Sequence, residues 1–180
     1  AFLDGTITLL DGITGKIISG IKTDPNATDL KNDPNPFFYV GFNPEGNELM
    51  TTDPGGTPCF WSAIDGKFIA KLRGEFKTYS LPSYSPDAEK IISTAADNSI
   101  NIWDANTHSL EYSFFQVGST DYMYVLPSGY YKATGSAARR LHYVTKDLEV
   151  MTFEQLDVKY NRPDKILEAV GCKNKILIDS

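Results

Sequence analysis

Hydrophobic and polar residues alternate along much of this chain in short runs, and turn-forming sequences separate the runs. Residues 91–94, 100–104 and 110–114 are three such runs, rich in Ile, Leu and aromatic residues. The sequences Ser-Pro-Asp, Asp-Asn-Ser and Asn-Thr-His lie before or between them, and Pro, Asp and Asn favour tight turns. Alternation with a period of two predicts β-strands with one buried face, joined here as hairpins.

The same order of turns and strands recurs at a fixed spacing. Pro44 and Pro86 are 42 residues apart, and so are Trp61 and Trp103. A period of about 40 to 45 residues with four short strands per repeat predicts the blade of a β-propeller. The two central repeats therefore predict two complete four-stranded blades.

Two further copies lie towards the ends of the chain. Residues 4–11 align with residues 97–104, so the chain is expected to begin inside a blade. Residues 122–125, 130–134 and 141–143 continue the spacing as strands of a last, more divergent blade. We therefore expect an all-β fold, a partial β-propeller of about three and a half four-stranded blades with a short C-terminal helix.

These residues resemble the WD-repeat family, whose members form β-propellers. The resemblance implies that Asp97 and Trp103 belong to a structural hydrogen-bond network with a Ser or Thr of the second strand. Trp61 would take the place of Trp103 in the preceding blade. The family's His ahead of the first strand has no counterpart in residues 72–81. Asp97, Trp61 and Trp103 are thus expected to be structural residues.

An arc of three and a half blades does not close into a ring, and its two end faces would stay exposed. The sequence therefore predicts either a piece of a longer protein or a second copy that supplies the missing faces. Isolated copies are expected to form a homodimer, in which residues 6–11 and 122–143 make the contact.

The net charge and the positions of Cys and His argue against several classes of function. A net charge of −6 argues against binding nucleic acid, which needs clustered cations, and no apolar run is long enough to cross a membrane. Cys59 and Cys172 lack metal-ligand spacing, and neither His108 nor His142 lies in a nucleophile motif. We expect no cofactor, no metal and no enzymatic activity; the compartment is not indicated.

Residues 23–36 interrupt the repeat with Asp, Asn and Pro. Proline disfavours a helix before it, so an extended loop is expected. A solvated loop, a partner-binding loop and a site for a hard cation such as Ca²⁺ are the three alternatives for this segment.

The end of the chain departs from the blades. Asn161 as N-cap, Pro163 in the first turn and Gly171 as C-cap predict a short helix, so the chain divides into a propeller part, 1–160, and a helical extension, 161–180. Arg162 and Asp164 are expected to be structural. Asp164 would accept backbone N–H groups of the first turn, and Arg162 would reach a strand carbonyl or a blade carboxylate. Docking of a downstream domain is the rival role.

A narrower resemblance covers residues 153–164, with 166–168 and 171. This stretch is similar to the segment that follows WD-type repeats in bacterial multidomain proteins carrying a caspase-like peptidase domain. The resemblance implies that this chain is the recognition or regulatory portion. It places the peptidase Cys and His beyond this segment, so Cys172, His108 and His142 receive no catalytic role.

The sequence as a whole predicts a non-catalytic interaction or scaffold module of a larger WD-repeat protein, with a protein as partner. Rigid blades would display loops that recognise this partner. Two alternatives stay open: a regulatory or sensor arm of a caspase-like peptidase, and a propeller enzyme with a site that faces its channel.

Overall fold

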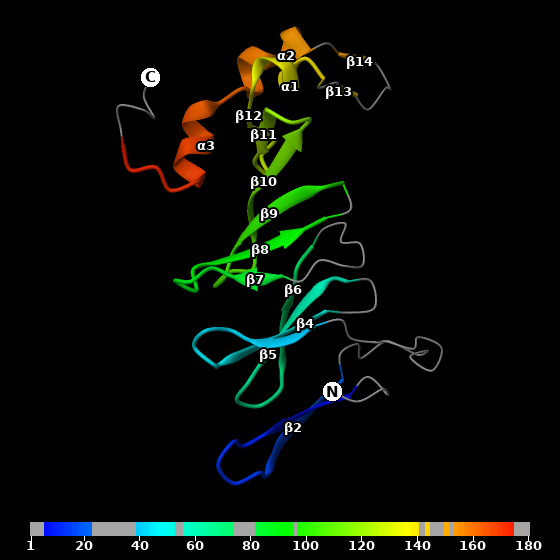
Figure 1. Cartoon of the computed structure of the whole chain (residues 1–180), viewed down its shortest axis with the longest axis vertical. Helices are drawn as coiled ribbons and strands as arrows, with labels where there is room; N and C mark the ends of the chain where they lie inside the picture. Colours follow the sequence, from blue (N-terminus) through cyan, green and yellow to red (C-terminus); the bar gives the residue numbers. More distant parts are fainter. Residues whose placement is uncertain are drawn as a thin grey trace. The chain divides into compact units, whose positions relative to one another are not determined.

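A computed structural model describes residues 6–22, 39–52, 56–73, 82–95, 97–140, 143–144, 150–151 and 153–174 (Figure 1). The expected loop at 23–36 and the expected strand residues 141–142 lie outside the described residues. The chain divides into two compact units, residues 1–96 with 104–109 and residues 97–103 with 110–180.

The first unit is built from antiparallel hairpins. Its strands are β1 (Thr6–Leu10), β2 (Ile17–Lys22), β3 (Val40–Phe42), β4 (Glu48–Thr52), β5 (Pro58–Ser62), β6 (Phe68–Lys71), β7 (Ser83–Tyr84) and β8 (Lys90–Thr94). β1 pairs with β2, β7 pairs with β8, and β3 to β6 form a four-stranded meander in chain order. A four-stranded meander is the blade that the first of the two central repeats predicts.

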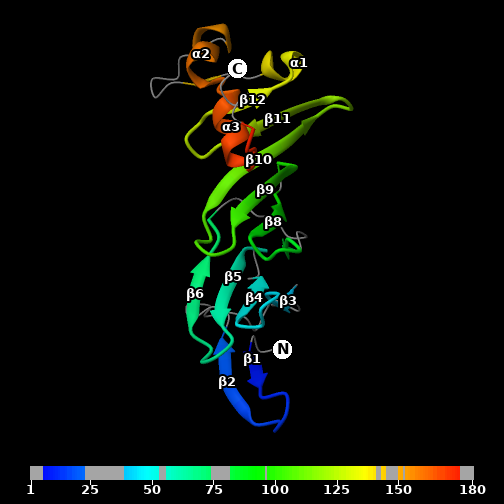
Figure 2. The same cartoon turned by 90° about the vertical axis from the view of Figure 1, so that its left-hand side faces the viewer.

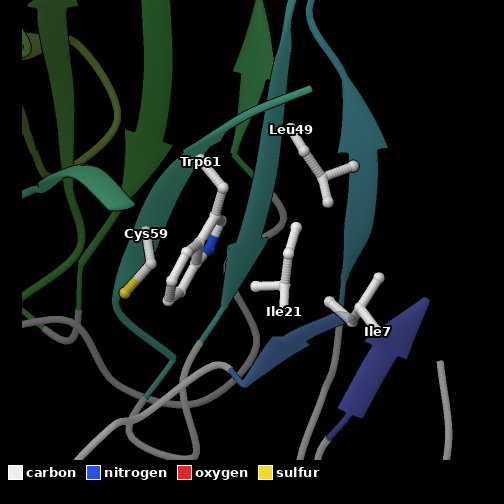
Figure 3. Close-up of a cluster of buried hydrophobic side chains, with 5 residues drawn as sticks. All are labelled: Ile7, Ile21, Leu49, Cys59 and Trp61. Carbon is white, nitrogen blue, oxygen red and sulfur yellow. The ribbon is translucent and has the colours of Figure 1, made fainter. Parts of the chain in front are cut away.

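A cluster of buried side chains joins the β1–β2 hairpin to this meander. Ile7 and Ile21 of the hairpin lie against Leu49 of β4 and against Cys59 and Trp61 of β5 (Figure 3). A two-stranded hairpin is marginally stable alone, so its apolar face must pack on another sheet. Cys59 is a free, buried cysteine and acts here as a small hydrophobic residue.

The second unit contains more strands and all the helices of the described chain. Its elements are β9 (Ser99–Asp104, the last residue of which belongs to the first unit), β10 (Leu110–Val117), β11 (Asp121–Val125), β12 (Tyr131–Ala133), α1 (Gly135–Ala138), β13 (Tyr143–Val144), β14 (Val150–Met151), α2 (Phe153–Tyr160) and α3 (Pro163–Ala169). β9 to β12 pair consecutively as a meander, and β13 pairs with β14.

The 42-residue repeat appears in the strand register. Trp61 pairs with Phe68 next to a register shift, and Trp103 pairs with Leu110 next to another. Both indole side chains are buried, with 4% and 2% of their residue surface exposed. The two tryptophans thus occupy equivalent positions on corresponding strands, as the spacing predicts.

The strands expected as a separate last blade have different partners. β11 pairs with β10 in the register Phe114 to Tyr124, and β12 pairs with β11. The cause is local: β10 runs to Val117, and Gly118, with a φ of +71°, begins a tight turn that folds the chain straight back. These strands therefore extend an existing sheet and do not start a new one.

The predicted C-terminal helix is confirmed, with small shifts at its start. Arg162, not Asn161, takes the N-cap position of α3, and Gly171 follows its end with a φ of +81°. Helical structure already begins at Phe153, ahead of the expected boundary at 160. α3 packs beside β12 (Figure 2), and its Ile166 is buried.

The fold is all-β with a few short helices, and among the described strands none pairs with the outer edges of the meander, β3 and β6. The predicted class, a partial propeller with a C-terminal helix, is confirmed. The helices in the described part of the chain are too short and too polar to span a bilayer.

Candidate interaction surfaces

A neighbouring strand holds the Trp61 side chain in place. In the first unit, Trp61 Nε1 donates a hydrogen bond of 3.0 Å to Thr51 Oγ1, and both residues are buried. Thr51 precedes Ser93 by the same 42 residues that separate the two tryptophans. The indole-to-hydroxyl bond expected around Trp103 is thus present at the equivalent position one repeat earlier.

Asp97 lies in the turn before β9. Its Oδ1 accepts a 2.9 Å hydrogen bond from the Ser99 backbone N–H, while its neighbour Asn98 has a φ of +64°. An Asp commonly stabilises such a turn in this way, because its carboxylate accepts a hydrogen bond from the backbone N–H two residues later. This geometry fits the structural role expected of Asp97.

Arg162 and Asp164 form an ion pair at the start of α3. Arg162 Nε donates to Asp164 Oδ1 at 2.8 Å, and Arg162 Nη2 donates to Asp164 Oδ2. The backbone N–H of Arg162 donates to the Tyr131 carbonyl of β12 at 2.9 Å. The strand carbonyl is therefore reached by the backbone and not, as expected, by the guanidinium. The Arg162 hydrogen bonds lower the pKa of Asp164 to about 2.

Replacing Arg162 by Gln should return the pKa of Asp164 towards its ordinary 3.8, measured by NMR titration of the carboxyl group. Because the folded-state pKa is depressed, the stabilisation is present above pH 4 or so and is lost as the pH falls towards 2. The stability difference between wild type and variant should therefore shrink over that pH window. An unchanged titration midpoint would show that Arg162 does not hold this carboxylate.

A partly buried polar trio lies in the first unit. Tyr84 Oη of β7 donates to Glu48 Oε1 of β4 at 2.6 Å, and His108 Nε2 lies 3.2 Å from Glu48 Oε2. The His108 and Glu48 side chains are only 7% and 12% exposed, and the Phe60 ring lies 4.3 Å from the imidazole. Burial, followed by the hydrogen bond to Glu48, raises the pKa of Tyr84.

Sequence reasoning missed this trio because its members are 36 and 60 residues apart along the chain. The sequence predicts only a turn at His108. The turn is present: His108 has a φ of +55° and its N–H donates to the Asp104 carbonyl at 2.9 Å. Nothing in the local sequence shows that this turn carries the imidazole to Glu48.

A polar cleft of about 340 Å³ opens beside the trio. Carboxylates, amides and hydroxyls supply most of its polar lining, which includes Asn43, Glu45, Asn47, Glu48, Ser62, Tyr84 and Asn106. Both oxygens of Glu48 already have partners within the trio. In the part of the chain that the structure describes, no three His, Cys, Asp or Glu residues are grouped so as to hold a metal ion.

An aromatic groove of about 550 Å³ lies in the second unit, between α3 and the β10–β12 strands. We use this name for the surface lined by Tyr112, Phe114, Tyr122, Tyr124, Lys132, Ile166, Leu167 and Val170. Strand register places the sheet residues on one face, because Tyr124 pairs with Phe114 on one side and with Lys132 on the other.

The rings of the groove pack on one another. Tyr124 lies 5.1 Å from Phe114, 5.8 Å from Tyr122 and 6.1 Å from Tyr112, between ring centroids. Tyr122 and Val170 are 36% and 41% exposed at this surface. The groove is thus a rigid aromatic floor with an aliphatic wall from α3, and part of it is open to solvent.

Among the described residues, Lys132 is the one charged residue that lines the aromatic groove. It is partly buried, and within the described residues it makes no ion pair and no hydrogen bond through its side chain. No local sequence pattern indicates Lys132 or the groove, because both depend on how β10, β11 and β12 pair.

Known proteins show similarity over part of the chain. No family model matches it. "WD repeat-containing protein 1" of Mus musculus is 32% identical over 84 residues, which are 44% of this chain and 14% of that protein. "Protein tipD" of Dictyostelium discoideum is 35% identical over 69 residues, 37% of this chain and 11% of that protein.

Among solved structures, the C-terminal WD40 domain of Sif2 aligns with a TM-score of 0.44 and 19% identity, over 66% of this chain and 35% of that one. The sequence relatives named above come from eukaryotes, and the link to bacterial caspase-like peptidases rests on the resemblance of residues 153–171 alone. Similarity to a protein named for its WD repeats supports the WD-repeat relationship predicted from the 42-residue spacing.

Proposed function

We propose that this chain is a non-catalytic protein-interaction module whose aromatic groove binds a peptide segment of another protein. The observation that carries the proposal is the groove itself: four packed aromatic rings and the aliphatic wall of α3, partly open to solvent. Tyr and Phe are enriched at protein interfaces, where rigid rings supply large contact areas at low entropic cost.

The size and build of the groove favour a peptide segment as the occupant. A volume of about 550 Å³ lies in the range of concave binding sites and accommodates a few side chains, not a flat protein surface. Its floor consists of paired strands, so little conformational entropy is lost on binding. Similarity to a WD-repeat protein supports an interaction role in general terms.

We assign the polar trio in the first unit a structural role. Glu48 accepts from Tyr84 and faces His108, so its two oxygens are occupied by neighbouring strands and turns. A regulatory arm of a peptidase and a propeller enzyme stay predictions of the sequence, and neither is needed to explain the groove.

Selection from a phage-displayed library of random peptides tests the proposal. We expect enriched peptides to bind the wild type, and to bind Tyr122→Glu or Val170→Glu at least about tenfold more weakly, because a charge then enters the apolar groove. Both residues are partly exposed, so the fold should tolerate the change. Val158→Glu, on an α2 residue that is 92% exposed, is the matched control. Equal binding to all four proteins would contradict the proposal.

A second copy of the chain is the rival occupant, as the predicted homodimer implies. Sedimentation at micromolar concentration, with wild type and Tyr122→Glu side by side, separates the two. If both samples are monomeric, the result supports another protein as the occupant of the groove. A wild-type dimer that dissociates on the Tyr122→Glu substitution would assign the groove to a second copy and overturn the peptide proposal.

A further inference from the structure

We propose that the segment bound in the aromatic groove is acidic, with an Asp or Glu carboxylate that pairs with Lys132 between large apolar side chains that pack on the rings. This inference rests on the proposed function and names the chemistry of the partner. The aromatic groove would then bind its ligand through apolar contacts and one charged contact.

The position of Lys132 carries the argument. It lies on β12 directly across from Tyr124, on the same face as the aromatic floor, and it is partly buried there. The other residues of the lining are aromatic or aliphatic, and none of them is a carboxylate. The described lining of the groove therefore offers no opposite charge to this cation, which an anionic group of a ligand would supply.

In the described part of the chain, no carboxylate pairs with the Lys132 ammonium group. Among the described residues it has no ion-pair or hydrogen-bond partner, whereas Lys165 on α3 pairs with Glu168 at 2.8 Å. The Tyr124 hydroxyl, across from Lys132 in the register, also lacks a hydrogen-bond partner within that part of the chain. An ammonium group and a phenol hydroxyl together offer donors to a single carboxylate.

Charge complementarity favours one carboxylate over a polyanion. The chain carries a net charge of −6, so a run of phosphates would be repelled, while one acidic side chain meets its cation locally. The flanking apolar residues of the segment would supply contact area, and the carboxylate would fix its register in the groove.

The experiment compares acidic and amide forms of one peptide. The most strongly enriched library peptide is synthesised with its Asp or Glu, and again with Asn or Gln in that place. On the wild type we expect the amide form to bind about tenfold more weakly, as the loss of a charge-assisted contact predicts. Lys132→Met should bind both forms equally weakly, and Lys132→Arg should restore the preference.

Lys165→Met is the matched control, because it removes a paired cation on the neighbouring helix and should leave the preference intact. If enriched peptides depend on Tyr122 but show no preference for an acid, the acidic occupant is overturned while the proposed function stands. If no enriched peptide depends on the groove, both are overturned.

The chain itself contains acidic segments of the same chemistry, among them residues 176–179, Ile-Leu-Ile-Asp, which follow α3. Each peptide is therefore also measured against Asp179→Asn. An unchanged affinity supports a partner segment. A clearly raised affinity in this variant would assign the groove to the chain's own acidic segment and overturn a partner as its occupant.

Discussion

Alanine at Trp103 or at Trp61 is expected to lower the free energy of unfolding by about 3–5 kcal/mol in each case, the usual cost of deleting a large buried aromatic side chain. Both tryptophans are almost fully buried on the third strand of a repeat. Trp61→Ala also removes the 3.0 Å hydrogen bond to Thr51 Oγ1 and leaves that buried hydroxyl without its donor.

Denaturant unfolding followed by circular dichroism measures this effect. Ile13→Ala, in a turn where the side chain is 98% exposed, is the control and should change stability by less than about 0.5 kcal/mol. A loss below about 1 kcal/mol for either tryptophan would mean that the two positions do not carry equivalent buried side chains, and the repeat register would be wrong.

Glu48→Ala should cost about 1–3 kcal/mol, because it removes the carboxylate that two partly buried side chains contact. Tyr84 Oη loses its 2.6 Å acceptor, and the ring nitrogen of His108 loses a carboxylate 3.2 Å away in surroundings that exclude most water. Glu48→Gln keeps an acceptor oxygen and should therefore cost less than Glu48→Ala.

A double-mutant cycle isolates the Glu48 contact. Combining Glu48→Ala with Tyr84→Phe should cost less than the sum of the two single changes, because both remove the same hydrogen bond. Glu45→Ala, at an exposed residue that lines the same cleft, is the matched control. Strict additivity, or a Glu48→Ala protein as stable as the control, would show that the trio does not hold these elements together.

The features that sequence could predict are those encoded locally. Alternation at Ile100 and Ile102 gave a strand, and the Asp-Asn turn before it has the positive φ that such turns need. The equal spacing of Trp61 and Trp103 gave corresponding positions in the sheets, because each repeat forms the same hairpins. Pro163 and Gly171 marked both ends of the short helix α3.

The features that were missed depend on contacts between distant or ambiguous segments. The 122–143 spacing suggested a new blade, yet Gly118 begins a turn that folds β11 back onto β10. The aromatic groove follows from this one hairpin, which sets Phe114 against Tyr124. Recognition of a three-residue turn at 118–120 was the signal that could have found it.

NMR chemical-shift mapping shows whether the aromatic groove is the recognition surface of this chain. An enriched library peptide is titrated into the isotope-labelled full chain, and the backbone amide shifts are followed. We expect the largest shifts on β10, β11, β12 and α3, with Lys132 and Tyr122 among them. Shifts concentrated instead on β3–β6 or around the Glu48 cleft would contradict it.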